Sequence, residues 1–353
     1  MKAWVLHGIG DLRYEDAQMP LLRPDEALVK VKASGICGSD IPRIYQNGTY
    51  HFPTIPGHEF SGMVEDIGTG VDSRFLGKRV GVFPLLPCME CGQCKRQHYE
   101  MCSRYSYLGS RTDGGFAEYV AVPWWNLMEL PKDISFEQAA MLEPMAVAVH
   151  AMRSALEGRR ELTKQTAIVV CGLGTIGTML VMFLWEAGYQ NILAASNKDY
   201  QRKTMLDLGI PAENIFASRS RDIVSWIMEC TEGCGADIFF DCVGRNEVIA
   251  AGVNAAAAGG QIQLVGNPAS DVVMDKAVYW KILRRQLTLK GIWNSTYMHS
   301  DDDDWHYCLK RLSEGRIHPE RFITHKLGFS GLERGLSIIR DKKEAYGKVM
   351  TMG

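Results

Sequence analysis

Short alternations of apolar and polar residues dominate the chain up to about residue 130. Four of them, separated by glycine, proline and aspartate, lie at residues 27–33, 62–68, 79–83 and 116–122. A period of two is typical of strands that bury one face, so the pattern predicts a barrel-like, all-β first domain. Residues 1–10 show the same alternation and are expected to form its first strand.

From Ser135 onward the pattern changes to the longer period of helices, first over residues 136–155. Continuous apolar runs then alternate with further helical stretches. The expected strands are 166–170, 191–195, 237–242, 261–265 and 287–292, and the expected helices are 176–187, 222–230 and 246–258. Strands and helices that alternate in this way predict an α/β domain with a parallel, doubly wound sheet.

These two patterns predict two domains, in keeping with a length of 353 residues. We place the α/β domain at residues 150–293. The first domain takes residues 1–149 together with the closing segment 294–353, which ends in a strand-like tail. Within that closing segment, the run Asp301–Asp304 is expected to be a solvated loop.

The charge balance argues against polyanionic partners. The chain has 39 Lys and Arg against 41 Asp and Glu, a formal net charge of -2, so neither nucleic acid nor a membrane surface is expected as a partner. We find no apolar run of about 18 residues and no secretory signal, and therefore expect a cytoplasmic protein. In a reducing compartment, the ten cysteines are expected to be thiols or metal ligands.

Four of the cysteines are closely spaced in one polar segment. Cys88, Cys91, Cys94 and Cys102 form a C-x2-C-x2-C-x7-C pattern. Two-residue gaps let thiolates turn back onto one Zn²⁺, and four thiolates leave no open coordination position, so the pattern predicts a structural zinc site. An iron–sulfur cluster and a set of free loop cysteines are the alternatives.

Three further residues of metal-ligand type stand at separated turn positions: Cys37, His58 and Glu143. Three protein ligands with one open position are the pattern of a catalytic zinc site, in which the ion acts as a Lewis acid. Each residue is a weak signal by itself, because a lone cysteine or histidine is more often simply packed or exposed.

The motif Gly57-His58-Glu59, the four-cysteine segment, the run 114–119 (GGFAEY) and a later glycine motif occur in an order that resembles the zinc-dependent medium-chain alcohol and polyol dehydrogenases. The resemblance covers essentially the whole chain. It implies a GroES-like β-barrel catalytic domain, a Rossmann domain and assembly as a homodimer or homotetramer.

The same resemblance implies roles for single residues. Cys37 and His58 would bind the catalytic zinc with Glu143, since a glutamate in place of a cysteine is typical of the polyol branch. Glu59 matches the acidic neighbour that acts around the metal or as an alternate ligand. Ser39 matches the hydroxyl that relays the substrate proton, a role its chemistry allows.

The glycine motif is Gly172-x-Gly174-x-x-Gly177, and it lies between an expected strand and an expected helix. In this context the first glycine makes the turn, the second admits a pyrophosphate and the third lets the helix pack on the strand. Thr175 and Ile176, inside the motif, open the helix whose N-terminus would face the phosphates.

The residues after the second strand of this domain bear on the choice of cofactor. An NAD site usually has an acidic residue about 20 positions after the glycines, but Ser196, Asn197 and Lys198 stand there instead. With Arg202 nearby, they favour the 2'-phosphate of NADP over NAD. Val265 and Gly266, which end a later strand, complete the expected cofactor site.

Within the polyol branch, the runs 42–44 (PRI), 58–62 (HEFSG), 84–88 (PLLPC) and 109–111 (GSR) resemble bacterial dehydrogenases of a hexitol phosphate, galactitol 1-phosphate. We therefore expect hydride transfer between NAD(P) and a secondary alcohol of a polyol, sugar or polyol phosphate. Arg43 and Arg111 are candidates for binding a substrate phosphate, and Asn294 for contacting substrate hydroxyls. The alternatives are a non-phosphorylated polyol or simple alcohol as substrate, a reductase of activated double bonds, and a non-catalytic nucleotide-binding protein.

Overall fold

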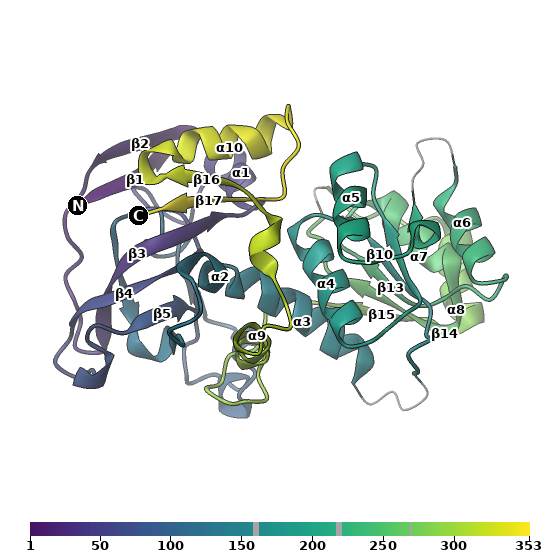
Figure 1. Ribbon diagram of the computed structural model, residues 1–353, viewed down its shortest axis with the longest axis horizontal. Helices are drawn as coiled ribbons and strands as arrows, with labels where there is room; N and C mark the ends of the chain where they lie inside the picture. The colour runs from purple at the N-terminus through teal and green to yellow at the C-terminus, as the bar shows by residue number, and fades with distance from the viewer. Residues whose placement is uncertain (158–161, 217–220, 269) are drawn as a thin grey trace. The chain divides into compact units, whose positions relative to one another are not determined.

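The computed structural model describes residues 1–157, 162–216, 221–268 and 270–353. Within these residues the chain divides into two compact units (Figure 1). The first unit is Met1–Ala146 with Ser295–Gly353, and the second is Val147–Asn294. The sequence pattern places the same two divisions at 149/150 and 293/294.

The first unit is built on a seven-stranded, mainly antiparallel sheet in the order β16-β17-β3-β4-β5-β9, with β8 also paired to β3. Its strands are β3 (Glu26–Ile36), β4 (Glu59–Ile67), β5 (Arg79–Val82), β8 (Tyr119–Pro123), β9 (Leu127–Glu129), β16 (Ile323–Gly328) and β17 (Lys348–Met352). Two small sheets pair β1 (Lys2–Gly8) with β2 (Asp11–Asp16) and β6 (Leu85–Leu86) with β7 (Ser106–Tyr107). The helices of this unit include α1 (Asp40–Pro42), α2 (Phe136–Ala140), α9 (Asp304–Ser313) and α10 (Leu332–Asp341).

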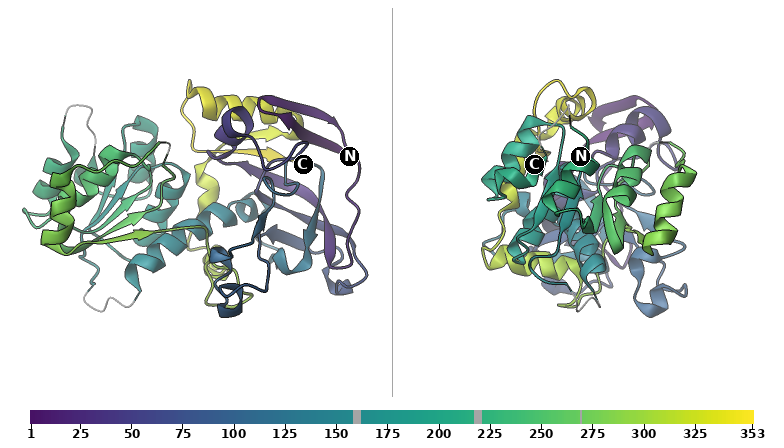
Figure 2. Two further views of the ribbon diagram at one scale, coloured as in Figure 1. Left: turned by 180° about the vertical axis from the view of Figure 1, so that it is seen from behind. Right: turned by 90° about the vertical axis from the view of Figure 1, so that its right-hand side faces the viewer.

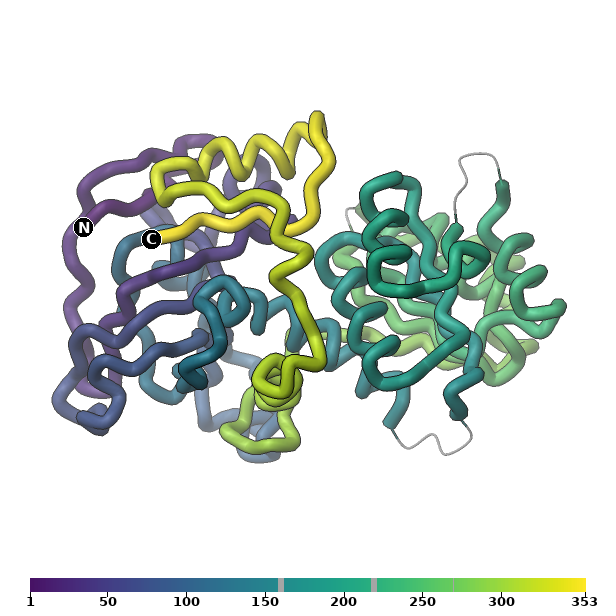
Figure 3. Tube along the Cα trace, viewed as in Figure 1, coloured from purple at the N-terminus to yellow at the C-terminus, as the bar shows by residue number. Residues whose placement is uncertain are grey.

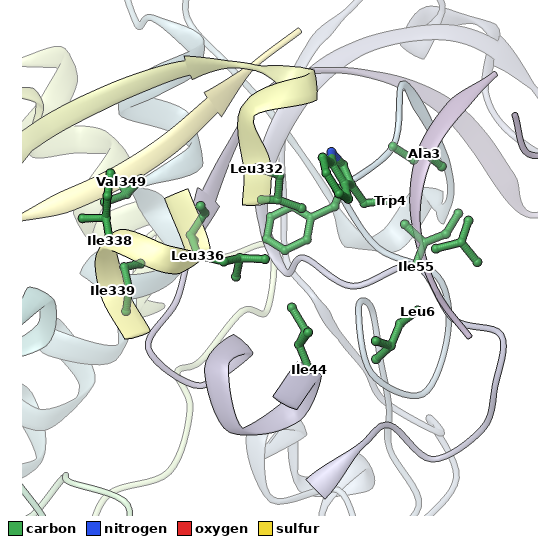
Figure 4. Packing of buried hydrophobic residues seen from close by; sticks show 14 residues of the cluster. Ala3, Trp4, Leu6, Ile44, Ile55, Leu332, Leu336, Ile338, Ile339 and Val349 are labelled. Carbon is green, nitrogen blue, oxygen red and sulfur yellow. The ribbon is translucent and has the colours of Figure 1, made fainter. Parts of the chain in front are cut away.

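The closing segment of the chain is an integral part of this first unit. Strand β17 lies between β16 and β3, parallel to the former and antiparallel to the latter. Helix α10 buries Leu332 and Leu336 in one apolar cluster with Trp4, Leu6 and Ile44 (Figure 4). Both views in Figure 2 and the trace in Figure 3 show this yellow segment beside the purple N-terminal strands. The first domain therefore contains both ends of the chain.

The expectation that Asp301–Asp304 form a solvated loop is wrong for two of the four residues. Asp301 and Asp302 are exposed, but Asp303 and Asp304 are buried. Asp303 caps α9 by accepting from the backbone N–H of His306 at 2.8 Å and also accepts from the N–H of Met298. Burial is tolerated because backbone donors satisfy the carboxylates, which a run of like charges in the sequence does not reveal.

The second unit is a six-stranded parallel sheet in the order β12-β11-β10-β13-β14-β15. Its strands are β10 (Ile168–Cys171), β11 (Ile192–Ala195), β12 (Ile215–Phe216), β13 (Ala236–Asp241), β14 (Ala256–Leu264) and β15 (Thr288–Gly291). Its helices are α4 (Thr175–Glu186), α5 (Asp199–Asp207), α6 (Ile223–Cys230), α7 (Asn246–Ala255) and α8 (Lys276–Arg285), while α3 (Leu142–Leu156) runs from the first unit into it. The strand order reverses between β10 and β13, the topological switch point at which Rossmann folds bind dinucleotides.

Most elements of the second unit follow the predicted pattern, but three of them are not predicted by the sequence. These are the two-residue strand β12 and the helices α5 and α8, which each bury only one side chain, Met205 and Val278 respectively. The single helix expected over residues 136–155 is divided into α2 and α3 at Met141. Among the described residues, no helix has the length and apolar character needed to cross a bilayer.

Candidate active site and metal centres

The register between β3 and β4 brings two predicted ligands together. Gly35 on β3 pairs with Glu59 on β4, so Cys37, just after β3, lies close to His58, just before β4. One ligand atom each from Cys37, His58 and Glu59 lies within 4.8 Å of the other two. A Cβ atom on Gly35 would lie 2.3 Å from Glu59 Oε2, so glycine is required for the carboxylate to fit.

Glu143 does not belong to this group of three. It is buried in the first turn of α3, where Tyr107 Oη donates to its Oε1 at 3.1 Å. Burial, opposed in part by His58, raises the pKa of Glu143 to about 7. Of the predicted trio, the structure thus groups Cys37 and His58 with Glu59, and places Glu143 next to them under the hydroxyl of Tyr107. The sequence contains no signal for Tyr107.

Asp40 is a second residue that sequence reasoning does not identify. Its buried carboxylate accepts from the backbone N–H of Cys37 at 2.9 Å and from Arg43 Nη1 at 2.9 Å, and lies 3.4 Å from His58 Nδ1. Burial disfavours a charged imidazole, but Asp40 and Cys37 outweigh this effect and raise the pKa of His58 well above its usual value. With Nδ1 turned to a carboxylate, Nε2 is the nitrogen left for a metal, the usual arrangement of a ligating histidine.

Lys348 is the third such residue. It is the first residue of β17, and both its side chain and that of Glu59, with which it forms an ion pair, are only 1% exposed. Because Val349 pairs with Ile36, Lys348 lies beside Cys37 at the end of the sheet. The only hint in the sequence is a lysine at the start of an otherwise largely apolar tail.

The donor set fits Zn²⁺, which binds cysteine sulfur, histidine nitrogen and carboxylate oxygen and keeps an open position when only three protein ligands are present. Ser39 caps the short helix α1, is half-buried and makes no side-chain capping hydrogen bond. In the sequence, Ser39 lies two residues after Cys37 and four residues before Arg43.

The four cysteines of the polar segment converge as predicted. Cys88, Cys91, Cys94 and Cys102 all have their sulfur atoms within 4.8 Å of one another. The Sγ–Sγ distances are 3.5 Å for Cys91–Cys94, 3.9 Å for Cys88–Cys94 and 3.9 Å for Cys91–Cys102. Four Zn–S bonds of about 2.3 Å in a tetrahedron give sulfur separations of about 3.8 Å, so the geometry fits one ion rather than a cluster of several irons.

Hydrogen bonds and burial shift the pKa values of two of the four thiols in opposite directions. Backbone N–H groups of Cys94 and Ser103 lower the pKa of Cys91 to about 5, whereas burial raises the pKa of Cys94 to about 12. A metal ion would be needed to hold the buried Cys94 as a thiolate near neutral pH.

Replacing Cys94 by serine is therefore expected to release one of two zinc ions per chain and to open residues 88–102 locally. The exposed Lys95 and Arg96 directly follow it, so trypsin should cleave the segment faster than in the wild type. Zinc analysis and timed proteolysis measure both effects. Cys234→Ser, at an exposed cysteine, is the control, and an unchanged zinc content in Cys94→Ser would contradict the assignment.

The glycine motif lies where the second unit reverses its strand order. Gly172 has φ +96°, and a Cβ on Gly177 would lie 2.0 Å from the carbonyl oxygen of Gly172. A Cβ on Gly174, by contrast, would meet nothing within 4 Å, and Gly174 caps α4, which begins at Thr175 and Ile176. The turn and the close packing thus require glycine, and the open side at Gly174 fits a pyrophosphate at the helix N-terminus.

The predicted cofactor residues surround the ends of β11 and β14. Ser196 is buried at the end of β11, and its hydroxyl accepts from the backbone N–H of Lys198 at 3.1 Å and donates to Gln201. Arg202 forms an ion pair with Asp199 and lies 3.4 Å from the Ser196 carbonyl. Asn197 lies between Ser196 and Lys198, while Val265 and Gly266 follow β14 and donate their N–H groups to the Asp241 carbonyl.

The three residues predicted to contact substrate lie in different settings. Arg43 is ion-paired with Asp40, and Arg111 is stacked over the rings of Tyr50 and Tyr105. Asn294 ends the second unit in a left-handed conformation, with φ +57°.

Comparison with known proteins gives a consistent match to both units. Residues 23–132 match the alcohol dehydrogenase GroES-like domain family, and residues 175–314 match the zinc-binding dehydrogenase family. Galactitol 1-phosphate 5-dehydrogenase of Escherichia coli K12 is 31% identical over 351 residues, 99% of either chain. L-Idonate 5-dehydrogenase of Vitis vinifera is 31% identical over 337 residues, 94% of this chain and 88% of the relative.

Solved structures agree. The crystal structure of the Escherichia coli galactitol-1-phosphate dehydrogenase superposes with a TM-score of 0.89 at 30% identity, over 100% of both chains. A zinc-binding dehydrogenase from Sinorhizobium meliloti, solved with NADP, and an alcohol dehydrogenase from E. coli CFT073, solved with NADH, have TM-scores of 0.88 and 0.87 at 25% identity, each over 100% of this chain and 99% of the other. The expected pairing of a GroES-like barrel with a Rossmann domain is thereby confirmed.

Proposed function

Because the chain belongs to the zinc-dependent medium-chain alcohol and polyol dehydrogenase family, we propose that it oxidises a secondary alcohol of a polyol or sugar, including polyol phosphates such as galactitol 1-phosphate. The reaction transfers hydride to NAD(P) and is reversible. Oxidoreductase activity follows from the family. The observation that carries the proposal is the group of Cys37, His58 and Glu59, whose ligand atoms lie within 4.8 Å, in a chain similar to a polyol phosphate dehydrogenase over its full length.

We propose that Cys37 and His58 bind the catalytic zinc together with a carboxylate. The 4.8 Å grouping supports Glu59 as that carboxylate, and the buried position of Glu143 beside the same residues supports an exchange between the two. When bound, zinc supplies a Lewis acid that polarises the substrate oxygen. Asp40 orients His58, and Lys348 holds Glu59, so both act through other residues.

Proton movement is assigned to Ser39. In the direction of oxidation, the substrate carbon loses a hydride and the substrate hydroxyl loses a proton, which leaves a ketone. Ser39 Oγ accepts that proton as its own proton passes to solvent, because the hydroxyl is half-buried and is not used in capping α1.

The proposed cofactor is NADP in preference to NAD. Support comes from Ser196 at the end of β11, where an acidic residue would bind the ribose of NAD, and from Arg202 and Lys198 beside it. Asp199 lies in the first turn of α5, beyond the end of the strand, and its carboxylate is paired with Arg202.

Ser196→Asp is expected to reverse this preference, because a carboxylate at the strand end repels a 2'-phosphate and accepts from the ribose hydroxyls of NAD. The ratio of kcat/KM for NADP to that for NAD should fall by about 100-fold, from charged hydrogen bonds of roughly 1.5–3 kcal/mol. Steady-state kinetics with both cofactors measure the ratio. Ser196→Asn, which has the same size and no charge, is the control, and an equal fall in both variants would refute the electrostatic argument.

A homodimer or homotetramer is part of the proposal, as is a cytoplasmic location. Strand β15 is the edge of its sheet, and the adjacent helix α8 exposes Tyr279, Trp280 and Leu283. An exposed strand edge next to apolar side chains favours pairing with a second copy. Light scattering should give the mass of an oligomer for the wild type. The double variant Trp280→Ser with Leu283→Ser should shift this mass toward that of the monomer. A monomeric wild type would refute the proposed assembly. The proposed cytoplasmic location is supported by the ten cysteines, none of which forms a disulfide.

A panel of substrates tests the reaction. Pentitols, hexitols, hexitol phosphates and simple secondary alcohols are each offered to the zinc-loaded enzyme with NAD and with NADP. Formation of reduced nicotinamide with a polyol or its phosphate is the expected result. Turnover of simple alcohols alone would show that the substrate is a simple secondary alcohol and not a polyol. No turnover with any of these compounds would refute the proposed function.

A further inference from the structure

Arg111 has an unusual setting for a surface arginine. Its guanidinium carbon lies 4.0 Å from the ring centroid of Tyr50 and 4.5 Å from that of Tyr105, and Nη2 donates to Tyr50 Oη at 3.1 Å. Across the described ranges, no carboxylate lies within 4.0 Å of it. Stacking fixes the plane of the group while its N–H edge keeps unused donors, which is the geometry that binds an anion.

The two loops that carry this group are tied to each other. His51 Nε2 lies 3.1 Å from the carbonyl oxygen of Arg111, and the N–H of Tyr50 donates to the carbonyl of Ser110 at 3.4 Å. Tyr50 nevertheless remains 70% exposed. The arginine is therefore held in position and is open to a ligand.

A chain of aromatic contacts connects Arg111 to the candidate metal centre. The ring of Tyr105 lies 6.4 Å from that of Tyr107, and the ring of Tyr107 lies 5.9 Å from that of His58. All of these residues belong to the first unit. Arg111 is thus on the same side of the unit as the metal ligands, two rings away from His58.

Arg43, the other candidate for binding a substrate anion, already forms an ion pair within the protein. Its Nη1 donates at 2.9 Å to Asp40, a buried carboxylate that also contacts His58. An arginine that compensates a buried carboxylate loses that compensation if it turns to a substrate anion. The sequence presents Arg43 and Arg111 equally as candidates for binding a substrate anion, whereas the structure favours Arg111.

We propose that Arg111 and Tyr50 bind an anionic end group of the substrate, a terminal phosphate or carboxylate at the end of the carbon chain that is not oxidised. Arg111 supplies charged N–H donors, and the Tyr50 hydroxyl, which accepts from Arg111, keeps its own proton to donate. The relatives named for galactitol 1-phosphate and for L-idonate act on carbon chains that carry a phosphate and a carboxylate respectively. This inference rests on the proposed polyol dehydrogenase function and narrows its substrate class to anionic polyols and sugar acids.

The test compares wild type, Arg111→Gln and Tyr50→Phe as full-length, zinc-loaded enzymes. The kinetic substrates are galactitol, galactitol 1-phosphate and L-idonate, and kcat/KM is measured for each. In Arg111→Gln, the ratio of kcat/KM for the anionic substrate to that for galactitol should fall about 10- to 100-fold, mainly through KM. Tyr50→Phe should lower the same ratio about 3- to 10-fold. A fall for galactitol 1-phosphate identifies the end group as a phosphate, and a fall for L-idonate identifies it as a carboxylate.

The control variant is Arg74→Gln. Arg74 is also exposed and stacked on an aromatic ring, that of Phe75, but it has Asp72 as counter-ion. It should leave all ratios unchanged.

Calorimetric titration with inorganic phosphate, without substrate or cofactor, keeps the inference separate from the proposed function. Phosphate should bind the wild type more tightly than Arg111→Gln. If it does so while no polyol is oxidised, the anion site stands and the dehydrogenase proposal fails. If polyols are oxidised but Arg111→Gln changes neither the ratio nor the binding of phosphate, the dehydrogenase proposal stands and the anion site is refuted.

Discussion

Replacing Cys37 by alanine is expected to lower kcat/KM for the alcohol substrate by about 1000-fold or more while the protein stays folded. Cys37 is the one thiolate in the group with His58 and Glu59, so its loss leaves only two donors of that group for the ion. A Lewis acid at the substrate oxygen contributes several kcal/mol to the transition state, which is a factor of about 1000 in rate. The side chain is small and half-buried, so the free energy of unfolding should change by no more than about 1 kcal/mol.

The zinc content of the variant distinguishes loss of a metal ligand from loss of the folded structure. The variant should bind one zinc ion per chain instead of two, because the four-cysteine site is built from a separate segment. Circular dichroism and thermal unfolding monitor the fold. Cys234→Ala, which removes an exposed cysteine of the second unit, should retain full activity and both ions. Loss of activity in Cys37→Ala with both ions retained would contradict its role as a ligand.

The second large effect is expected from Lys348→Met, which should destabilise the first unit by about 3–5 kcal/mol. Lys348 and Glu59 are buried almost completely, and the ion pair between them offsets the cost of removing both charges from water. Methionine retains most of the volume of lysine, so the main consequence is a buried carboxylate without its counter-ion. The same variant should also lower zinc affinity, because Lys348 fixes the carboxylate of Glu59 beside Cys37 and His58.

Lys326→Met provides a matched control from the neighbouring strand β16. Lys326 pairs with Glu137 at 3.0 Å, but its side chain is half exposed, so its removal should cost no more than about 1 kcal/mol. Denaturant titrations compare the two lysine variants after zinc is removed with a chelator, because a bound ion would itself neutralise Glu59. The double variant Glu59→Leu with Lys348→Met should recover most of the stability but not the activity. Equal destabilisation by the two lysine variants would show that burial does not set the strength of the Glu59–Lys348 pair.

Features of this chain that are encoded locally could be predicted well. Gly172 and Gly177 require glycine because of a positive φ and of close packing, respectively, and both requirements depend only on a strand and a helix that meet there. Likewise, the cysteines at 88, 91, 94 and 102 need only a short loop to converge. Helix α5 was missed because it is polar and buries one side chain, which leaves little apolar periodicity. Helix α8 does have an apolar face, with Val278 and Ile282 on the core, but Tyr279, Trp280 and Leu283 are apolar and exposed, which blurs that pattern in the sequence.

The sequence by itself determined the fold class, the four-cysteine pattern and the dinucleotide turn, because each depends on residue type and short spacing. It identified Cys37 and His58 as candidate ligands only through the resemblance to the dehydrogenase family, because these two residues are far apart in the chain. Only the tertiary structure decided which carboxylate groups with Cys37 and His58, and that Asp40, Tyr107 and Lys348 surround them. Lys348 on β17 meets Glu59 on β4 beside the intervening strand β3, although the two residues lie near opposite ends of the chain. Asp303 is buried because backbone donors reach it. Such contacts depend on sheet register and on local hydrogen bonding in three dimensions, which leave no periodicity or spacing in the sequence.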